Sequence, residues 1–134
     1  ILYNDYIVNT IIEKVNKKNT TSFVLYFSDH GEEVYDTIDF SGHNEDVGTL
    51  PMFQIPFILW QSELHKKASN VTKLLNRPYM IDDLFHSIAD LCGITDKNVN
   101  SNRSIFSETY INKKRVILEN KNYDSLLLKM SLRK

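Results

Sequence analysis

The chain contains a short apolar run that ends abruptly at polar residues. Residues 22–27 read Ser-Phe-Val-Leu-Tyr-Phe, and Ser-Asp-His-Gly follows directly at 28–31. An uninterrupted run of β-branched and aromatic residues is typical of a strand that is buried in a sheet, and the abrupt change predicts that this strand ends in a loop. Residues 55–60 form a second run of this kind. Any fold of this chain therefore has to cover a buried sheet.

Two segments with apolar residues at helical spacing flank these strands. Residues 3–15 carry the first stripe, and Lys17 and Lys18 follow it, where cations stabilise the C-terminal end of a helix dipole. Residues 81–92 carry the second stripe, and Gly93 stands where a helix would stop. Helix, strand, long loop, strand and helix together predict an α/β fold.

The remaining segments are predicted from turn residues and short apolar runs. Residues 96–103 are polar and are expected to form a surface loop. Further strands are expected at 116–119 and 123–128, separated by an Asn/Lys turn.

Size and composition fit one domain. With 134 residues, 42% of them hydrophobic, the chain can bury a substantial core, and its net charge of -1 gives no reason to expect a nucleic-acid partner.

No window approaches the roughly 18 apolar residues of a membrane helix. The start lacks a signal-peptide pattern and a Met, which suggests a piece of a longer protein. A single cysteine, Cys92, excludes an internal disulfide and leaves the redox compartment open.

A polar stretch of more than twenty residues joins the two apolar runs. Loops of this length within a compact domain are usually functional or disordered. Open α/β sheets bind their ligands at the carboxyl ends of their strands, so the functional residues are expected directly after residue 27.

Asp29 and His30 are the strongest candidates for chemistry in this stretch. Neighbouring strand residues point to opposite faces, so both can bind one metal ion only if the backbone bends there, and Gly31 permits positive φ. Carboxylate oxygen and imidazole nitrogen are both good zinc ligands. The residues alone leave two interpretations open: a partial metal site, or a turn aspartate beside a solvated imidazole.

At these residues the sequence resembles the phosphoethanolamine transferases, which belong to the sulfatase and alkaline phosphatase superfamily. The likeness extends over nearly the whole chain, and its most specific part is the Ser-Asp-His-Gly-Glu core. The segments at 32–36 and 39–43 are more similar to the members that modify the heptose core of lipopolysaccharide than to those that modify lipid A. The resemblance is carried by residues 1–6, 26–33, Gly42-His43, 55–60 and 77–79.

The resemblance implies a fold and a location. Residues 1–134 are expected to form the C-terminal part of a catalytic domain, an alkaline phosphatase/sulfatase-like α/β/α sandwich with a mostly parallel central sheet. The parent protein is expected at the periplasmic face of the bacterial inner membrane. In the family, the membrane helices, the nucleophilic threonine and a further carboxylate ligand precede the segment that matches Ile1. The isolated chain is therefore expected to be inactive and to hold zinc weakly, if at all.

The resemblance also implies roles for individual residues. Asp29 and His30 are expected to be zinc ligands, and His43 to face the transferred phosphate or a second metal. Glu32 is a candidate for orienting a zinc-bound histidine. The expected reaction passes phosphoethanolamine from phosphatidylethanolamine to lipopolysaccharide. The side chains of Asp29, His30 and His43 are then expected to converge in one small region.

Other polar residues have simpler interpretations. Glu33 follows a glycine turn and is expected to be solvated, although it is also a candidate, after Glu32, for orienting a zinc-bound histidine. His65 and His86 are expected to be structural or solvated, and Cys92 to be a small buried hydrophobe on the helical stripe. Asp36 and Asp39 are expected to be loop acids, although either could recognise an ethanolamine ammonium group.

Two alternative functions stay open at this stage. Another enzyme of the same superfamily, such as a sulfatase or a phosphoglycerol transferase, would share the Asp-His pair and the later histidine. A non-catalytic binding or structural domain would contain the same residues without any common role.

Overall fold

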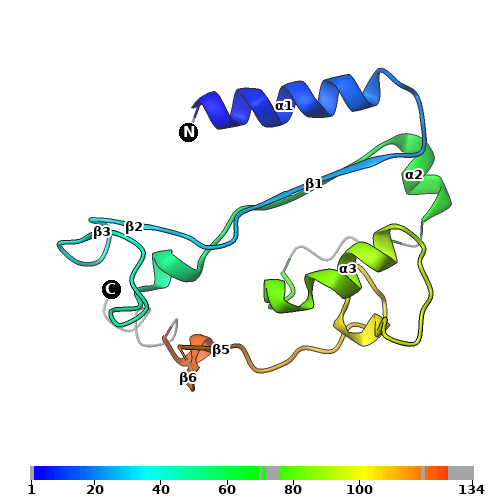
Figure 1. The fold of residues 1–134 in the computed structure, drawn as a ribbon. Helices are drawn as coiled ribbons and strands as arrows, with labels where there is room; N and C mark the ends of the chain where they lie inside the picture. The colour runs from blue at the N-terminus through cyan, green and yellow to red at the C-terminus, as the bar shows by residue number, and fades with distance from the viewer. Residues whose placement is uncertain (1, 70, 72–75, 119, 127–134) are drawn as a thin grey trace.

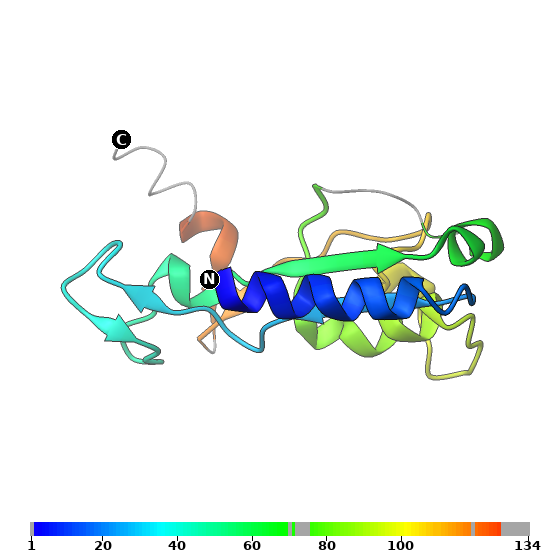
Figure 2. The same ribbon diagram turned by 90° about the horizontal axis from the view of Figure 1, so that it is seen from above.

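Two layers flank a two-stranded sheet in the computed structural model, which describes residues 2–69, 71, 76–118 and 120–126. The sheet consists of β1 (Phe23–Phe27) and β4 (Phe57–Gln61). Helix α1 (Leu2–Asn16) lies along one face, and the segment with α3 (Leu84–Leu91) lies on the other (Figures 1 and 2). This layering agrees with the predicted α/β class.

Helix α1 confirms the first predicted helix. Its side chains Val8, Ile12 and Val15 are half-buried and share one face of the helix, at the spacing that stacks residues on successive turns. Val8 and Ile12 line a small cleft together with Tyr26 of β1 and Ile58 of β4. Burial of this stripe against the sheet therefore fixes α1 on its face.

The expected mostly parallel sheet is a wrong prediction for the described residues. Strand β4 pairs antiparallel to β1, with Phe27 opposite Phe57 and Phe23 opposite Gln61. A parallel partner would need a crossover connection, usually a helix, whereas the chain between these strands forms turns, a hairpin and a 3-10 helix beyond the end of the sheet. The chain therefore turns back along β1. The second strand begins at Phe57 rather than residue 55, since Pro56 has no amide hydrogen to donate.

Aromatic rings hold the second face of the sheet. The ring centroid of Phe57 lies 5.6 Å from that of Tyr79 and 6.2 Å from that of Phe106. Phe23 contacts His65 of α2 (Glu63–Ala68) with ring centroids 5.3 Å apart. Contacts of this kind contribute beyond the area that they bury, so the apolar β1 and β4 sequences are explained by layers on both sides.

His65 has the structural role that was expected. Its Nδ1 accepts a hydrogen bond from Gln61 Nε2 at 2.7 Å, and its Nε2 donates to the carbonyl oxygen of Leu91 at 3.0 Å. The buried ring therefore joins α2 to the end of α3. His86 is also buried, and its Nδ1 accepts from the amide of Asn100 at 3.3 Å.

The second predicted helix begins as a 3-10 turn, η2 (Ile81–Asp83), and continues as α3. Gly93 ends it with a φ of 65°, as the stop signal predicts.

Asp83 is fully buried and pairs with Arg103 and with Lys113, whose Nζ lies 2.8 Å from Asp83 Oδ2. Arg103 belongs to η3 (Ser101–Arg103), a single turn within the segment predicted as a loop. Cys92 is exposed, contrary to expectation, because it follows the last buried position of α3.

The last predicted strand is wrong where the structure describes it. Strand β5 (Val116–Ile117) pairs with β6 (Lys121–Asn122), and residue 119 lies outside the described residues. Residues 123–126 are helical, whereas 127 and 128 also lie outside the described residues. Asn122 Oδ1 accepts hydrogen bonds from the amides of Asp124 and Ser125, as a helix-capping side chain does. The cap therefore overrides the apolar pattern.

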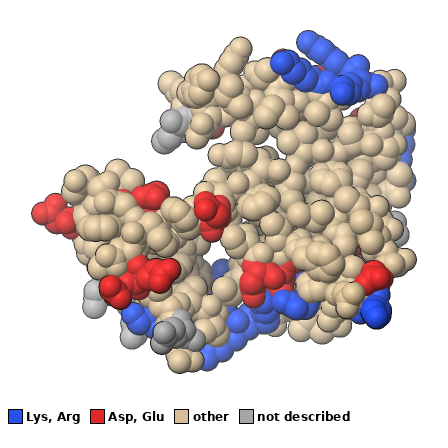
Figure 3. All heavy atoms as spheres, viewed as in Figure 1, with Lys and Arg blue, Asp and Glu red and all other residues tan. Residues whose placement is uncertain are grey.

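The surface carries charges of both signs. On the face seen in Figure 3, basic side chains gather over the C-terminal end of α1, acidic side chains lie over the hairpin, and both kinds lie side by side over the lower part of the molecule. Among the described residues, no helix combines the length and hydrophobicity needed to cross a bilayer.

Candidate functional site

The turn after β1 brings Asp29 and His30 to one side of the chain. The Ser28 hydroxyl donates to the carbonyl oxygen of His30 at 2.8 Å, and Asp29 Oδ1 accepts from the His30 amide at 3.1 Å. These local bonds replace strand pairing, which lets the two side chains leave the alternating geometry of the strand. The backbone bend that a shared site requires is therefore present.

Gly31 is required at this turn by close packing. Its amide donates to the carbonyl oxygen of Met52 at 3.0 Å, and Met52 is fully buried in η1 (Leu50–Phe53). A Cβ atom at position 31 would lie 2.0 Å from the carbonyl oxygen of Pro51 and 2.4 Å from that of Gln54. The prediction that positive φ explains this glycine is wrong, because Gly31 is not among the residues with positive φ. Close approach of two backbones excludes any side chain.

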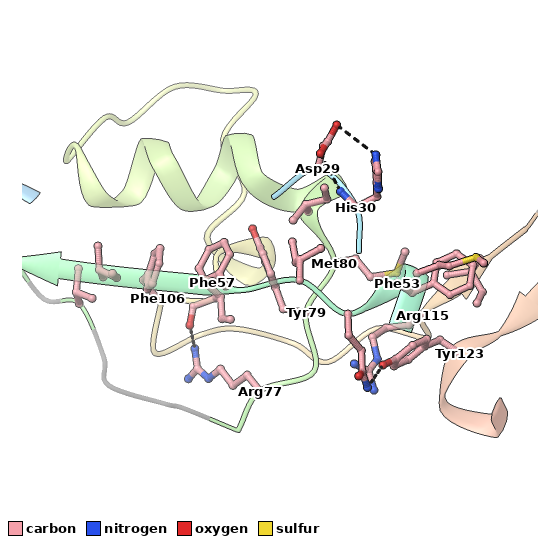
Figure 4. Close-up of a pocket in the computed structure, with 18 of the residues that line it drawn as sticks. Asp29, His30, Phe53, Phe57, Arg77, Tyr79, Met80, Phe106, Arg115 and Tyr123 are labelled. Atoms are coloured by element: carbon pink, nitrogen blue, oxygen red, sulfur yellow. Dashed lines mark hydrogen bonds and ion pairs between the residues drawn. The ribbon is translucent and has the colours of Figure 1, made fainter. Parts of the chain in front are cut away.

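The His30 ring is fixed through Nδ1. This nitrogen lies 2.9 Å from the carbonyl oxygen of Gly31, to which its N–H donates, so the neutral ring presents the lone pair of Nε2. Nε2 lies 3.9 Å from Asp29 Oδ2 (Figure 4). A backbone carbonyl is one of the common partners for the second ring nitrogen of a metal-binding histidine.

The two side chains also shift each other's titration. The pKa of the Asp29 carboxyl is lowered, first by the backbone amide of Asp29 and then by the amide and the ring of His30. The hydrogen bond to Gly31 raises the pKa of His30, and the carboxylates of Asp29 and Glu32 add to this rise against the effect of partial burial. Near neutral pH, Asp29 is therefore a carboxylate available to a cation.

His43 lies against His30. It follows the hairpin of β2 (Glu33–Val34) and β3 (Ser41–Gly42), and Gly42 has a φ of 127°, where side chains are strained. The ring centroids of His30 and His43 are 4.3 Å apart, with 31° between the ring planes. Asp29, His30 and His43 also line one cavity. The expected convergence of these side chains is thus present, while their roles stay predictions.

Glu32 lies beside the same ring. Its Oε1 is 3.7 Å from His30 Nδ1, too far for a hydrogen bond but close enough for charge attraction. Nδ1 bonds to the Gly31 carbonyl instead. Orientation of His30 by Glu32 therefore stays a prediction. Asp36 and Asp39 are exposed in the hairpin loop, as expected of loop acids.

Glu33 is fully buried, and the expectation that it is solvated is wrong. Its carboxylate accepts hydrogen bonds from the amides of Asp36 and Thr37, the latter at 2.9 Å, and from the Thr37 hydroxyl. Burial alone would raise the pKa of Glu33, but these hydrogen bonds, together with the Thr49 side chain, lower it to about 2. A signal was present in the sequence, since a threonine four residues later can close a turn onto a carboxylate.

Substituting glutamine for Glu33 should flatten the acid side of the stability curve. A pKa held at about 2, below the ordinary value of 4.5, stabilises the folded state above pH 4.5, and this contribution is lost as the pH falls through 2. The variant should be less stable at pH 7 and should lose less stability between these two pH values. Urea unfolding midpoints across this range measure both effects, and parallel curves for the two proteins would contradict the assignment.

A cavity of about 890 Å³ adjoins these residues. Asp29, His30 and His43 supply polar groups to its lining, and the rest is mostly apolar, including Phe57, Met80 and Phe106. Figure 4 shows Asp29 and His30 at one end of the cavity and Arg77 and Arg115 at other parts of it. Few convergent polar groups in a mostly apolar cavity are typical of a binding site for a small molecule or lipid group.

Both arginines are already engaged. Arg77 Nη1 donates to the carbonyl oxygen of Ile105 at 2.7 Å and to that of Ser107, whereas Arg115 pairs with Asp124. Their guanidinium groups therefore link segments of the protein to one another in the absence of a ligand.

Asp29 and His30 fit two positions of a zinc site. Two ligands about 2.0 to 2.2 Å from a tetrahedral ion lie roughly 3.4 Å apart. The separation of 3.9 Å between their donor atoms approaches this value. Within the described part of the chain, no group of three His, Cys, Asp or Glu side chains is arranged to hold a metal. The two side chains are therefore spaced as part of a metal site would be, and their role as zinc ligands stays a prediction.

Comparison with known proteins places this geometry in a family. Residues 1–94 match the family model described as Sulfatase. The chain is 37% identical over 113 residues to phosphoethanolamine transferase EptC of Escherichia coli strain K12, which covers 81% of this chain and 20% of that protein. It is 43% identical over 95 residues to phosphoethanolamine transferase CptA of Salmonella typhimurium strain LT2, which covers 65% of this chain and 16% of that protein. The chain thus spans about a fifth of the length of these relatives.

A solved structure is similar as well. The C-terminal periplasmic domain of E. coli EptC, crystallised as a complex with Zn, matches with a TM-score of 0.84 and 36% identity. The match covers 93% of this chain and 38% of that one. The fold of this chain is therefore similar to that of a protein domain crystallised as a complex with Zn.

Proposed function

Because the chain belongs to the sulfatase family, we propose that residues 1–134 form part of the catalytic domain of a phosphoethanolamine transferase. Asp29 and His30 are proposed as two of its zinc ligands, and His43 as the group that faces the transferred phosphate. The separation of 3.9 Å between Asp29 Oδ2 and His30 Nε2 carries the proposal, since it brings two donor atoms close enough to bind one cation. Similarity to EptC, which has been crystallised with Zn, supports the choice of metal.

The residues of this chain would each have a distinct task. Bound zinc would supply positive charge that polarises a phosphoryl oxygen. Asp29 contributes an anionic oxygen ligand, and His30 a neutral nitrogen whose direction is set by the Gly31 carbonyl. When protonated, the exposed ring of His43 would donate a hydrogen bond to a phosphate oxygen or a leaving oxygen.

The activity proposed for the whole protein is inferred from the same relatives. Phosphatidylethanolamine is proposed as the donor and lipopolysaccharide as the acceptor, with core heptose favoured over lipid A by the likeness at 32–36 and 39–43. The periplasmic face of the bacterial inner membrane is the proposed location, since the chain resembles a periplasmic domain. No residue of this chain is proposed as the nucleophile.

Replacement of His43 by glutamine in the complete protein tests the phosphate-facing role. Loss of this hydrogen-bond donor should lower the rate of phosphoethanolamine transfer by about 100-fold. Zinc content should stay unchanged, because Asp29 and His30 keep their contacts. Transfer is measured by mass spectrometry of lipopolysaccharide, and metal by elemental analysis. Glu45→Gln, an exposed change in the same polar stretch, should leave both values intact, and full activity of His43→Gln would contradict the role.

A further inference from the structure

We propose that Glu33 is a positioning residue that holds His43 against His30. The effect of Glu33 on catalysis rests on the proposed function. Its effect on the position of the His43 ring does not, because that position is a property of the fold. The observation behind it is a fully buried carboxylate that bonds to a short hairpin loop, which also has backbone hydrogen bonds from Tyr35 to Phe40 and from Phe40 to Ile38.

The carboxylate of Glu33 closes the hairpin loop from inside. It accepts from the amides of Asp36 and Thr37 and from the Thr37 hydroxyl, so both of its oxygens are engaged. Hydrogen bonds to an ionised acceptor are about twice as strong as those between neutral groups. Removing this acceptor would take away the partner that the amides of Asp36 and Thr37 share, and with it bonds that stabilise the loop.

The hairpin depends on such an anchor because its strands are very short. Only Glu33 opposite Gly42 and Val34 opposite Ser41 form the ladder between β2 and β3. Isolated two-stranded hairpins are marginal in water even when they are longer. Gly42 pairs with Glu33, and His43 follows Gly42 directly. The position of Glu33 therefore also sets the position of the His43 backbone.

The other half of the site has hydrogen bonds of its own. Asp29 and His30 are fixed by Ser28, by the Gly31 carbonyl and by the bond from the Gly31 amide to Met52. None of these contacts involves Glu33. Loss of the Glu33 carboxylate should therefore move His43 while Asp29 and His30 keep their places.

Hydrogen exchange tests the anchor directly. In the complete protein, Glu33→Ala should speed exchange of the amides in residues 34–43 by at least about tenfold, with α1 and β1 unchanged. Glu45→Ala is the matched control, since Glu45 is an exposed glutamate beyond β3. If alanine prevents folding, Glu33→Gln keeps the shape of the side chain and should give a smaller increase in the same segment. Unchanged exchange at 34–43 in a folded variant overturns the inference.

A double-mutant cycle tests the path through His43. Glu33→Gln should lower kcat for transfer without lowering zinc content, and adding it to His43→Gln should lower kcat by less than twofold more. Independent losses that multiply in the double variant would overturn the positioning role. Full transfer by His43→Gln alone would instead count against the proposed function, and the exchange result would still decide whether Glu33 anchors the hairpin.

Discussion

Alanine in place of His30 should reduce phosphoethanolamine transfer by at least about 1,000-fold in the complete protein. The expected size follows from the several kcal/mol that a metal ion contributes to stabilising charge in the transition state. Asp29→Ala should have a comparable effect, and the double variant should be little worse than either, because each change disrupts the same site. Transfer to lipopolysaccharide by mass spectrometry and bound zinc by elemental analysis are the measurements.

Stability provides the control for these variants. His30 and Asp29 are exposed, so their replacement should leave the thermal midpoint nearly unchanged while zinc is kept absent by a chelator. Glu45→Ala, an exposed acidic residue with no proposed role, should retain full transfer and full zinc content. Normal transfer by the variant lacking both Asp29 and His30 would rule out the zinc-ligand assignment.

Gly31→Ala should disable the same site through packing. Its Cβ would approach the carbonyl oxygens of Pro51 and Gln54 to 2.0 and 2.4 Å, so the turn or η1 has to move. Overpacking of this kind typically costs about 1–3 kcal/mol of stability. Displacing a reacting group by only 1 Å can cost about 100-fold in rate, and Asp29 and His30 lie directly before the glycine. Urea denaturation and transfer rate measure the two effects.

Gly93→Ala offers a matched comparison. It introduces the same methyl group at a glycine with a φ of 65°, but no atom lies within 4 Å of the new carbon. The variant should lose about 1 kcal/mol through backbone strain and keep normal transfer. Equal losses of transfer in the two glycine variants would show that general destabilisation, rather than the turn at Gly31, explains the effect.

The sequence predicted the local features that depend on neighbouring residues. The end of β1 at Phe27, the helix stripes of α1 and α3 and the stop at Gly93 all follow from short-range patterns. The proximity of His43 to His30 was also predicted, although thirteen positions separate them, because the resemblance supplied what the spacing alone does not contain.

Features set by tertiary contacts were missed. The antiparallel pairing of β4 depends on where the connection runs, which apolar runs do not encode. Glu33 looks like a solvated acid until the hairpin closes over it, and Gly31 looks like a flexible turn until η1 packs against it. In each case a segment distant in sequence, or a folded loop, determines the environment of the residue.

A crystal structure of the complete protein with zinc, with the metal located by anomalous scattering, tests the central claim most directly. We expect a carboxylate oxygen of Asp29 and Nε2 of His30 to lie about 2.0 to 2.2 Å from one zinc ion, with Nδ1 of His30 still bonded to the Gly31 carbonyl. A fully occupied zinc ion bound without either residue would contradict the claim.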